Sequence, residues 1–394
     1  MIITLVMDQY GDTSNGTTTT AMRLAEIMRK HSHTVRIVTS VENVKEENVY
    51  VVPERNLPLL NNIVHAQGMK LAKPDKKILT DAIEGADIVH FFLPFGLSKA
   101  GKAIADKHHI ATTAAFHVQP ENITYTIKMN KVELVNVVIY KLFEQFYNKF
   151  SHIHCPSRML KDILDGYGYK AEKHVISNGV SDFFVKTESV RPKEFEGQFL
   201  ILMSGRFSRE KRQDLIIEAV AGSKYADDIR LIFCGKGPWK NALIKKAESL
   251  GLKNKPVFKF CDWAQLRDTI NYCDLYVHAS DVEIEAISCM EAFACGLVPV
   301  ISDSPMVATK QFALDEKNLF KKGNAEDLRN KIEYFIEHPD EKQEYSERYT
   351  EYAKNFRAEA CVAEMEKMFE TAIAENRAKW GDRVGVATER KHRG

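Results

Sequence analysis

The sequence alternates short apolar segments, rich in β-branched residues, with helical patterns, and it does so in two separate series. The first series opens with IITLVM (2–7), a polar loop, a helical pattern and then VRIVTS (35–40). A strand, a helix and a second strand in this order form a βαβ unit, which implies a parallel sheet. The second series extends from FLILMS (199–204) to LVPVIS (297–302). We therefore predict an α/β chain with two doubly wound, Rossmann-like domains.

The domain boundaries follow from changes in composition. The segment KTESVRPKEFEG between the two series is polar, charged and interrupted by a proline, which is typical of a linker. Residues 340–378 have a helical pattern throughout, with one apolar face, and the chain then ends in a basic tail. The predicted division is an N-terminal domain 1–185, a linker 186–197, a C-terminal domain 198–355, a helix 356–380 and a tail 381–394.

Charge and cysteine content exclude several classes of protein. Lys and Arg number 55 against 54 Asp and Glu, so no overall field attracts nucleic acid, and we expect no nucleic-acid partner. The seven cysteines include no Cys-x-x-Cys pair, which argues against a disulfide framework or a zinc ribbon and favours a cytoplasmic location. His152 and His154 have no further metal ligand near them in sequence, so we expect them to be structural. No apolar run is long enough to span a bilayer, so any membrane contact is expected to be peripheral.

Open α/β sheets bind ligands beyond the carboxyl ends of their strands, so the residues that follow each strand are the candidates for a site. In the first series, Gly16 lies in the loop before a helix, where backbone amides favour an anion. His117 follows IATTAAF (110–116) and can hydrogen-bond a ligand. The plainer alternatives are a glycine turn at Gly16 and a histidine bonded to neighbouring backbone at His117.

In the second series, Arg206 and Lys211 follow the strand FLILMS. Together they suit a diphosphate, because arginine offers a planar set of donors and lysine a compact charge. Gly235 and Gly237 follow the strand RLIFC (230–234), where glycines let backbone approach a ligand closely. A solvated basic turn and an ordinary Gly-Pro turn are the alternatives.

Two carboxylates follow the strand LYVHAS (275–280). Glu283 and Glu291 are eight positions apart, which on one helix is about 12 Å of rise. That separation is too large for one metal ion, and it suits two hydroxyl-bearing parts of an extended ligand. The helix start between them, from Ala286 to Ser288, can hold a phosphate. Two surface glutamates are the alternative interpretation.

These motifs together resemble the retaining nucleotide-sugar glycosyltransferases of family 4, which have the GT-B fold, and among them the bacterial glycolipid glucosyltransferases. The resemblance covers nearly the whole chain and ends in a Glu-x7-Glu signature. The motifs are NG (15–16), AFH (115–117), PS (156–157), SNGV (177–180), SGRFSREKRQDLI (204–216), CGKGP (234–238), CDLYVHAS (273–280) and EIEAISCMEAFACGLVPVI (283–301).

The resemblance implies a role for each candidate in the C-terminal domain, which would bind a UDP-sugar donor. Arg206 and Lys211 would neutralise the diphosphate, Glu283 would hold sugar hydroxyls, and Glu291 would hold the ribose hydroxyls. The backbone contacts to the donor would come from Gly235, Gly237, Ala286, Ile287 and Ser288.

The resemblance also implies how the N-terminal domain, which would bind the acceptor, takes part. Gly16 would let its loop close on the diphosphate, and His117 would bond the sugar and stabilise the reacting centre. The two domains would face each other across a cleft, with the C-terminal helix crossing back to the N-terminal domain. The resemblance further implies that no cofactor, metal ion or protein nucleophile is needed. The leaving phosphate would deprotonate the acceptor, which attacks from the same face of the sugar, so the anomeric configuration would be retained.

The sequence departs from the usual start of the signature, Glu-Gly-Phe-Gly. It has Glu283-Ile284-Glu285-Ala286, so a Cβ narrows the approach at Ala286 and Glu285 adds a charge near the sugar. These changes leave the class intact and leave the identity of the donor sugar open.

The acceptor is the least constrained part of the prediction. The segment 127–150 combines four lysines with five aromatic residues, which is consistent either with core packing of helix 131–150 or with a membrane-interface helix. The resemblance favours glucose transfer to a lipid such as diacylglycerol at the inner face of the plasma membrane. A polysaccharide or polyprenyl-linked acceptor is the alternative. A catalytically silent GT-B partner, a phosphorylase and an epimerase are the competing functions; the five charged or histidine candidates favour an active transferase.

Overall fold

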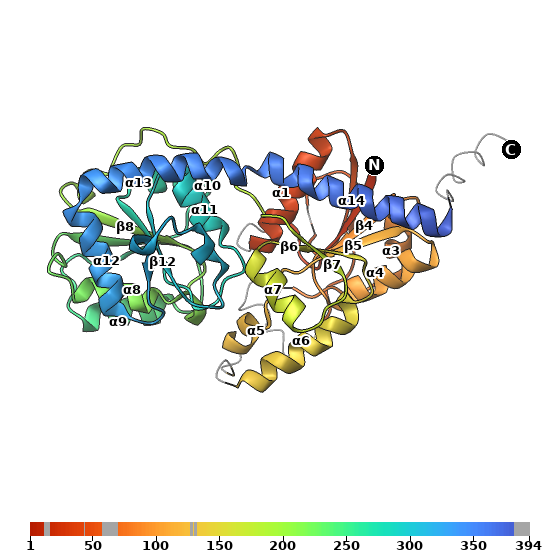
Figure 1. The fold of residues 1–394 in the computed structure, drawn as a ribbon, viewed down its shortest axis with the longest axis horizontal. Helices are drawn as coiled ribbons and strands as arrows, with labels where there is room; N and C mark the ends of the chain where they lie inside the picture. Colours follow the sequence, from red (N-terminus) through yellow and green to blue (C-terminus); the bar gives the residue numbers. More distant parts are fainter. Residues whose placement is uncertain (12–15, 43, 57–69, 127–128, 130–131, 382–394) are drawn as a thin grey trace. The chain divides into compact units, whose positions relative to one another are not determined.

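The computed structural model describes the chain except for residues 12–15, 43, 57–69, 127–128, 130–131 and 382–394 (Figure 1). The chain divides into two compact units. Unit 1 comprises Met1–Pro120, Val132–Ser177 and Cys361–Gly394, and unit 2 comprises Glu121–Lys131 and Asn178–Ala360. The division after Ser177 precedes the predicted linker because Val180 and Phe184 are fully buried in the hydrophobic core of unit 2. Most of the predicted tail 381–394 lies outside the described residues.

Unit 1 is built on a seven-stranded parallel sheet in the order β3-β2-β1-β4-β5-β6-β7. The strands are β1 (Ile2–Val6), β2 (Thr34–Thr39), β3 (Val49–Val51), β4 (Ile88–Phe91), β5 (Ala111–Ala115), β6 (His152–Cys155) and β7 (Glu172–Val175). The helices that belong to it are α1 (Gly16–Lys30), α3 (Lys76–Ile83), α4 (Gly96–Lys107), α6 (Glu133–Tyr147) and α7 (Arg158–Gly166), while α5 (Pro120–Thr126) begins where the chain enters unit 2. The order reverses between β1 and β4, as in a doubly wound fold.

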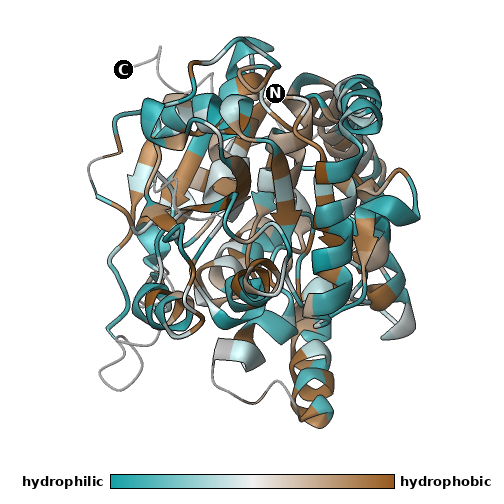
Figure 2. Cartoon of the chain, turned by 90° about the vertical axis from the view of Figure 1, so that its left-hand side faces the viewer, coloured by the Kyte–Doolittle hydropathy of each residue, from teal (hydrophilic) through white to brown (hydrophobic). Residues whose placement is uncertain are grey.

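Unit 2 is built on a six-stranded parallel sheet in the order β10-β9-β8-β11-β12-β13. Its strands are β8 (Phe199–Ser204), β9 (Ile229–Cys234), β10 (Val257–Lys259), β11 (Leu275–His278), β12 (Pro299–Ser302) and β13 (Leu319–Phe320). Its helices are α8 (Gln213–Ala221), α9 (Lys240–Ser249), α10 (Trp263–Tyr272), α11 (Ile287–Ala294), α12 (Ala325–Glu337) and α13 (Pro339–Tyr352). Figure 2 shows the mainly hydrophobic strands against helices of mixed hydropathy, the pattern expected when helices cover both faces of a buried sheet.

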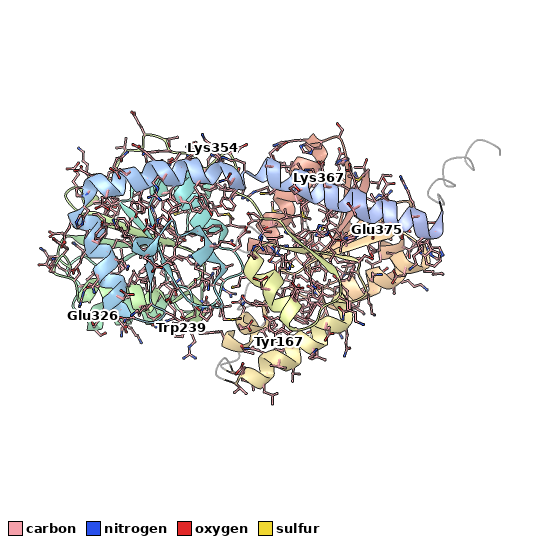
Figure 3. All side chains as sticks on the ribbon, viewed as in Figure 1. Tyr167, Trp239, Glu326, Lys354, Lys367 and Glu375 are labelled. Atoms are coloured by element: carbon pink, nitrogen blue, oxygen red, sulfur yellow. The ribbon has the colours of Figure 1, made fainter. Side chains whose placement is uncertain are left out.

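The final helix, α14 (Ala358–Trp380), carries an apolar face of the kind that the sequence predicts. Met365, Phe369 and Ile373 on this face are all buried, and Phe369 lies 5.2 Å from the ring of His90 in unit 1. The opposite side carries charged residues such as Lys367, which is labelled together with Glu375 in Figure 3. This packing confirms that the C-terminal helix returns to the N-terminal domain.

The helical pattern predicted over 340–378 is interrupted at one point, close to the predicted start of the last helix at 356. A short 3-10 turn (Ala353–Phe356) and an extended Arg357 separate α13 from α14. Here the backbone pairs with the SNGV segment: the Val180 N–H donates to the Phe356 carbonyl at 2.7 Å, and the Ala358 N–H donates to the Val180 carbonyl at 3.0 Å. Gly179 has a φ of 73°, and a Cβ there would lie 2.7 Å from the Ala358 Cα, so this close approach requires glycine.

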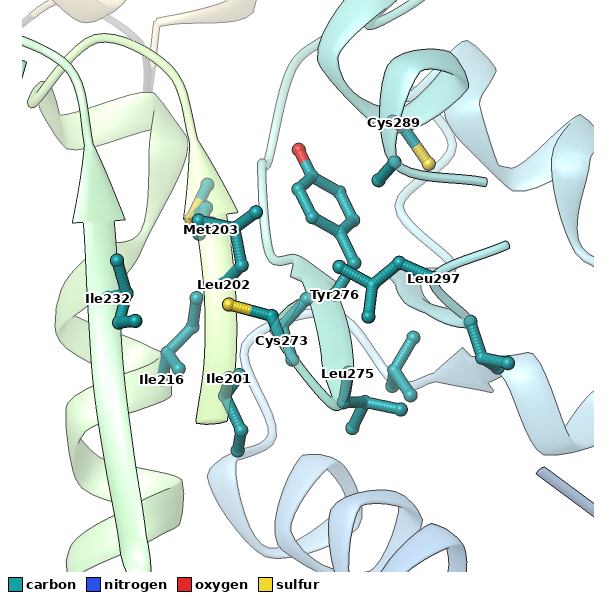
Figure 4. Close-up of a cluster of buried hydrophobic side chains, with 14 of the residues drawn as sticks. Ile201, Leu202, Met203, Ile216, Ile232, Cys273, Leu275, Tyr276, Cys289 and Leu297 are labelled. Atoms are coloured by element: carbon teal, nitrogen blue, oxygen red, sulfur yellow. The ribbon is translucent and has the colours of Figure 1, made fainter. Parts of the chain in front are cut away.

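The core of unit 2 fills the space between β8, β11 and the helices beside them. Figure 4 shows Leu202 and Met203 of β8 together with Tyr276 of β11 and Cys289 of α11, and the strand register pairs Leu202 with Tyr276. All four side chains are buried at 1% exposure or less. Because interiors are close-packed, this contact fixes where the loops after β8 and β11 begin.

No helix in the described part of the chain is both long enough and apolar enough to cross a membrane.

Candidate active site

The strand order places the candidate residues of unit 2 at one position. β8 and β11 are neighbours, and the strand order reverses between them, so the loops that follow these two strands meet at the topological switch point of the sheet. Arg206 and Lys211 follow β8, and Glu283 and Ala286 follow β11. The strongest sequence candidates therefore share the place where an open α/β sheet binds its ligand.

Lys211 and Glu283 form a direct ion pair across this switch point. His278, at the end of β11, places its Nε2 3.4 Å from the same carboxylate. Burial raises the pKa of Glu283, but the charge of Lys211 and the neighbouring His278 outweigh it and lower that pKa to about 2. Burial in turn lowers the pKa of His278. At neutral pH the site therefore holds an ionised carboxylate, an ammonium group and a neutral imidazole.

Arg206 is positioned by the turn that follows β8. Its Nη2 donates to Glu210 Oε1 at 3.1 Å, and the Ser208 hydroxyl donates to the same buried carboxylate. The Gln213 amide donates to the Arg206 carbonyl at 2.9 Å. The guanidinium is therefore oriented by an intraloop ion pair, and it is present as a fixed cation.

Gly235 and Gly237 are needed for loop packing. A Cβ on Gly235 would lie 2.0 Å from the Gly205 carbonyl oxygen, and one on Gly237 would lie 2.3 Å from the Phe207 carbonyl oxygen. The Phe207 N–H also donates to the Lys236 carbonyl at 2.9 Å. The sequence signal was read as room for a ligand; in the structure the glycines let the β9 loop press against the loop that carries Arg206.

The start of α11 is shaped by Ala286. Ala286 adopts φ 64° and ψ 77°, a left-handed conformation that favours glycine. Its side chain makes no capping hydrogen bond, so it does not occupy the first amides of α11, which include Ile287 and Ser288. The Tyr276 hydroxyl donates to Ser288 Oγ at 3.0 Å and fixes that side chain. The helix start thus offers backbone donors toward an anion.

The two other glutamates of the segment 283–301, Glu285 and Glu291, are both buried. Glu285 was expected to add charge near the sugar, but it is buried and accepts the Asn178 N–H at 2.9 Å, so it fastens the SNGV segment. Glu291 lies on α11 and is also buried.

In unit 1, His117 follows β5 and is buried. Its ring stacks on Phe92 with centroids 5.6 Å apart, and His154 lies edge-on at 5.4 Å. Burial, together with His154 and His90, holds the pKa of His117 well below its usual range, so the ring is neutral. Its Nε2 is buried without a hydrogen-bond partner among the described residues, which leaves that atom for a ligand.

Sequence reasoning missed two further polar groups in unit 1. Asp8 follows β1, accepts the Ala72 N–H at 2.9 Å, and has its pKa raised to about 6 by burial. Gln119 is fully buried, and neither polar atom of its side chain has a partner in the described parts of the chain. Asp8 directly follows the apolar run 2–7, which was the available signal for it, whereas Gln119 comes three residues after the run 110–116. Gly16 is the first residue of α1 and has open space where a Cβ would lie, while the loop residues 12–15 before it are outside the described residues.

Two family models match the chain side by side. The model described as "Glycosyltransferase Family 4" matches residues 14–182, and the model described as "Glycosyl transferases group 1" matches residues 185–356. The chain is a family 4 glycosyltransferase. The two matches meet close to the boundary between unit 1 and unit 2.

Individual proteins similar to this family 4 glycosyltransferase include an enzyme of lipid glycosylation. Alpha-monoglucosyldiacylglycerol synthase of Streptococcus pneumoniae is 25% identical over 77% of this chain and 71% of that protein. The catalytic domain of cholesterol-alpha-glucosyltransferase from Helicobacter pylori is 46% identical over 40% of this chain and 98% of that structure, with a TM-score of 0.39. Anabaena Alr3699/HepE, solved with UDP-glucose, is 16% identical over 94% of this chain and 100% of that structure, with a TM-score of 0.75, which confirms the GT-B fold.

Proposed function

We propose that this glycosyltransferase moves glucose from UDP-glucose to a hydroxyl of a membrane lipid such as diacylglycerol, with retention of the anomeric configuration. The observation that carries the proposal is the switch point of unit 2, where Lys211 pairs with the half-buried Glu283 shortly before the first amides of α11. Cations and helix amides complement a diphosphate, and an ionised carboxylate accepts hydrogen bonds from sugar hydroxyls. Supporting the donor, Anabaena Alr3699/HepE has been solved with UDP-glucose on the same fold.

In the proposed reaction the bond between the anomeric carbon and the phosphate oxygen breaks, and a bond to the acceptor oxygen forms on the same face. The leaving phosphate takes the acceptor's proton, so UDP leaves and no protein nucleophile is needed. Arg206 and Lys211 stabilise the charge that develops on the diphosphate. Glu283 and the backbone of Gly235, Gly237, Ala286, Ile287 and Ser288 orient the donor sugar and phosphates. Glu291 binds the ribose, and Gly16, the first residue of α1, contacts the diphosphate. His117, held neutral, contributes a hydrogen bond to the sugar.

A lipid acceptor is supported by the surface of α6. Leu134, Val138 and Leu142 are spaced four residues apart on one side of this helix and are 69%, 50% and 54% exposed. Phe146 and Tyr147, by contrast, are buried, so α6 combines core packing with an exposed apolar stripe. Such a stripe suits the interface of a bilayer. The lipid-linked product of the Streptococcus pneumoniae relative supports the same acceptor class.

The test is release of UDP from UDP-glucose in metal-free buffer, with and without vesicles that contain diacylglycerol. We expect vesicle-dependent release and an α-linked glucolipid. The double variant Leu134→Gln/Leu142→Gln should bind vesicles at least tenfold more weakly, whereas Val190→Gln, which changes a side chain that is 91% exposed in unit 2, should not. Transfer to soluble or polyprenyl-linked acceptors alone would replace the lipid proposal, and no release from any nucleotide sugar would favour a silent GT-B partner.

A further inference from the structure

A cluster of metal-binding side chains lies at the end of the unit 1 sheet opposite to His117. β6 begins with His152 and the parallel edge strand β7 begins with Glu172. The register pairs His152 with Glu172 and His154 with His174. Paired residues, and residues two apart in one strand, project from the same face of a sheet, so these side chains share one face. Their place at the amino ends of the strands separates them from the proposed active site.

Three of these side chains converge on one point. His152 Nδ1 lies 3.0 Å from His174 Nε2 and 3.6 Å from Glu172 Oε2, and Glu172 Oε1 lies 3.7 Å from His174 Nε2. One ligand atom from each residue lies within 4.8 Å of the other two. Ligand atoms around a tetrahedral zinc ion, with bonds of about 2.0–2.1 Å, are about 3.3 Å apart, so the observed spacing needs only small adjustments.

A second carboxylate orients the buried histidine. His152 Nε2 lies 2.9 Å from Glu375 Oε2 on α14. When Nε2–H donates to Glu375, Nδ1 keeps its lone pair and points it at His174 and Glu172. A ligating histidine whose other nitrogen donates to a carboxylate is the usual arrangement around protein-bound zinc. His154 does not take part, because its Nε2 is 2.7 Å from the Ile176 carbonyl.

We propose that His152, His174 and Glu172 bind a zinc ion that fastens α14 to the edge of the seven-stranded sheet through Glu375. Two imidazoles and one carboxylate suit zinc better than magnesium or calcium, which prefer oxygen ligands alone. The ion is structural and is not part of glycosyl transfer. His152 and His174 are 22 positions apart, so only the β6–β7 register reveals the site that sequence spacing suggested was absent.

The test is zinc binding to the full chain, freed of any purification tag and treated with a chelator. We expect calorimetry to show one equivalent binding with a Kd on the order of 1 μM or tighter. His174→Asn should weaken binding at least 100-fold, and Glu375→Gln should weaken it about 10- to 100-fold through loss of the outer carboxylate. His108→Asn, which removes an exposed histidine outside the cluster, should leave the affinity unchanged.

A second measurement distinguishes the loss of zinc binding from a folding defect in the variant. Hydrogen exchange of α14 amides should slow when zinc is added to the original chain and to His108→Asn, and should not change in His174→Asn, whose circular dichroism should match. Equal zinc affinity in the original chain and His174→Asn would overturn the proposal, because the ion would then bind elsewhere. Binding without any change in α14 exchange would overturn the fastening role.

Discussion

The carboxyl ends of the two sheets carry polar groups of opposite character. In unit 2 the switch point is made of charges in pairs, with Lys211 bound to Glu283 and Arg206 to Glu210. In unit 1 the equivalent edge carries two buried side chains without a net charge, the imidazole of His117 and the amide of Gln119. His117 Nε2 and both polar atoms of the Gln119 amide have no hydrogen-bond partner among the described residues. One edge is built to hold an ionic ligand, and the other offers uncharged hydrogen-bonding groups.

Two carboxylates make the same contrast quantitative. Asp8 follows β1 in unit 1 and burial raises its pKa to about 6, whereas in unit 2 burial of Glu283 is outweighed by Lys211 and His278, so that its pKa falls to about 2. The difference follows from the partner: Asp8 receives a backbone N–H, and Glu283 receives an ammonium group. The partner therefore stabilises the charge of Glu283, whereas the charge of Asp8 forms only above about pH 6 and costs free energy there.

The largest effect is expected at the charged edge. Glu283→Ala should lower the rate of transfer about 10³-fold, because an oriented group at the reacting sugar is lost, while UDP affinity should change less than threefold. Initial rates and UDP calorimetry measure the two effects. Glu196→Ala, at an exposed glutamate of unit 2, is the control. Retained transfer with lost UDP affinity would assign Glu283 to the nucleotide.

At the carboxyl edge of the unit 1 sheet, removal of the His117 imidazole should slow transfer without changing the affinity for UDP. His117→Ala should slow transfer about 10²-fold and leave the Kd for UDP unchanged, since UDP lacks the sugar that His117 is proposed to contact. The same rate and calorimetric measurements apply, with the exposed His108→Ala as the control. Weaker UDP binding in His117→Ala would remove the distinction between the two edges.

The pH dependence of the free energy of unfolding should differ between the two carboxylates, Asp8 and Glu283. The pKa of Asp8 is about 6 in the folded state and near 3.8 in the unfolded state, so the protonated side chain favours folding. Its contribution to the free energy of unfolding is therefore complete below pH 4 and is lost as the pH rises through 6. Asp8→Asn should therefore stabilise unit 1 by about 1–3 kcal/mol at pH 7 and have little effect at pH 4. Thermal unfolding at both pH values measures this.

The control for that experiment is Asp81→Asn, which changes an exposed carboxylate of unit 1. Glu283 has the opposite sign: its pKa is lowered from 4.5 to about 2, so its contribution is present above pH 5 and is lost as the pH falls toward 2. An Asp8→Asn variant that is equally destabilised at pH 4 and pH 7 would show that burial of the Asp8 charge does not cost stability.

The smallest effect is expected at Ala286. Ala286→Gly should remove a backbone strain of about 1 kcal/mol that the left-handed conformation imposes on alanine. Glycine also gives the unfolded chain more entropy, which offsets part of this effect, so the free energy of unfolding should rise by less than about 1 kcal/mol. Ala292→Gly, in the interior of α11, should instead lower stability by about 1 kcal/mol. Chemical denaturation of the two variants gives the comparison, and a destabilised Ala286→Gly would contradict the strain.

The sequence predicted the elements better than the contacts between them. The predicted strands 199–204 and 230–234 match β8 and β9 to within one residue, because mainly apolar runs with polar flanks are strong local signals. The break at Arg357 was missed, because its cause is pairing with Val180, far away in the chain. A local pattern cannot contain a long-range partner.

The site shows the same limit. Arg206, Lys211 and Glu283 were identified from their places after strands, a rule that the sheet order obeys. The packing role of Gly235, the fastening role of Glu285 and the approach of His174 to His152 depend on neighbours in space. Asp8 follows a strand as well, but the sequence around it does not indicate that its side chain is buried, so it was not identified.

The pairing of Val180 with the backbone on either side of Arg357 has a topological consequence. The chain enters the main part of unit 2 at Asn178 and leaves it at Ala360, and the two hydrogen bonds of Val180 hold these ends together. The segment between them is thus an insert whose two ends meet at one clasp, with Gly179 as its tightest point. A segment with joined ends can be cut out or exchanged as a cassette without leaving a gap in the chain that receives it.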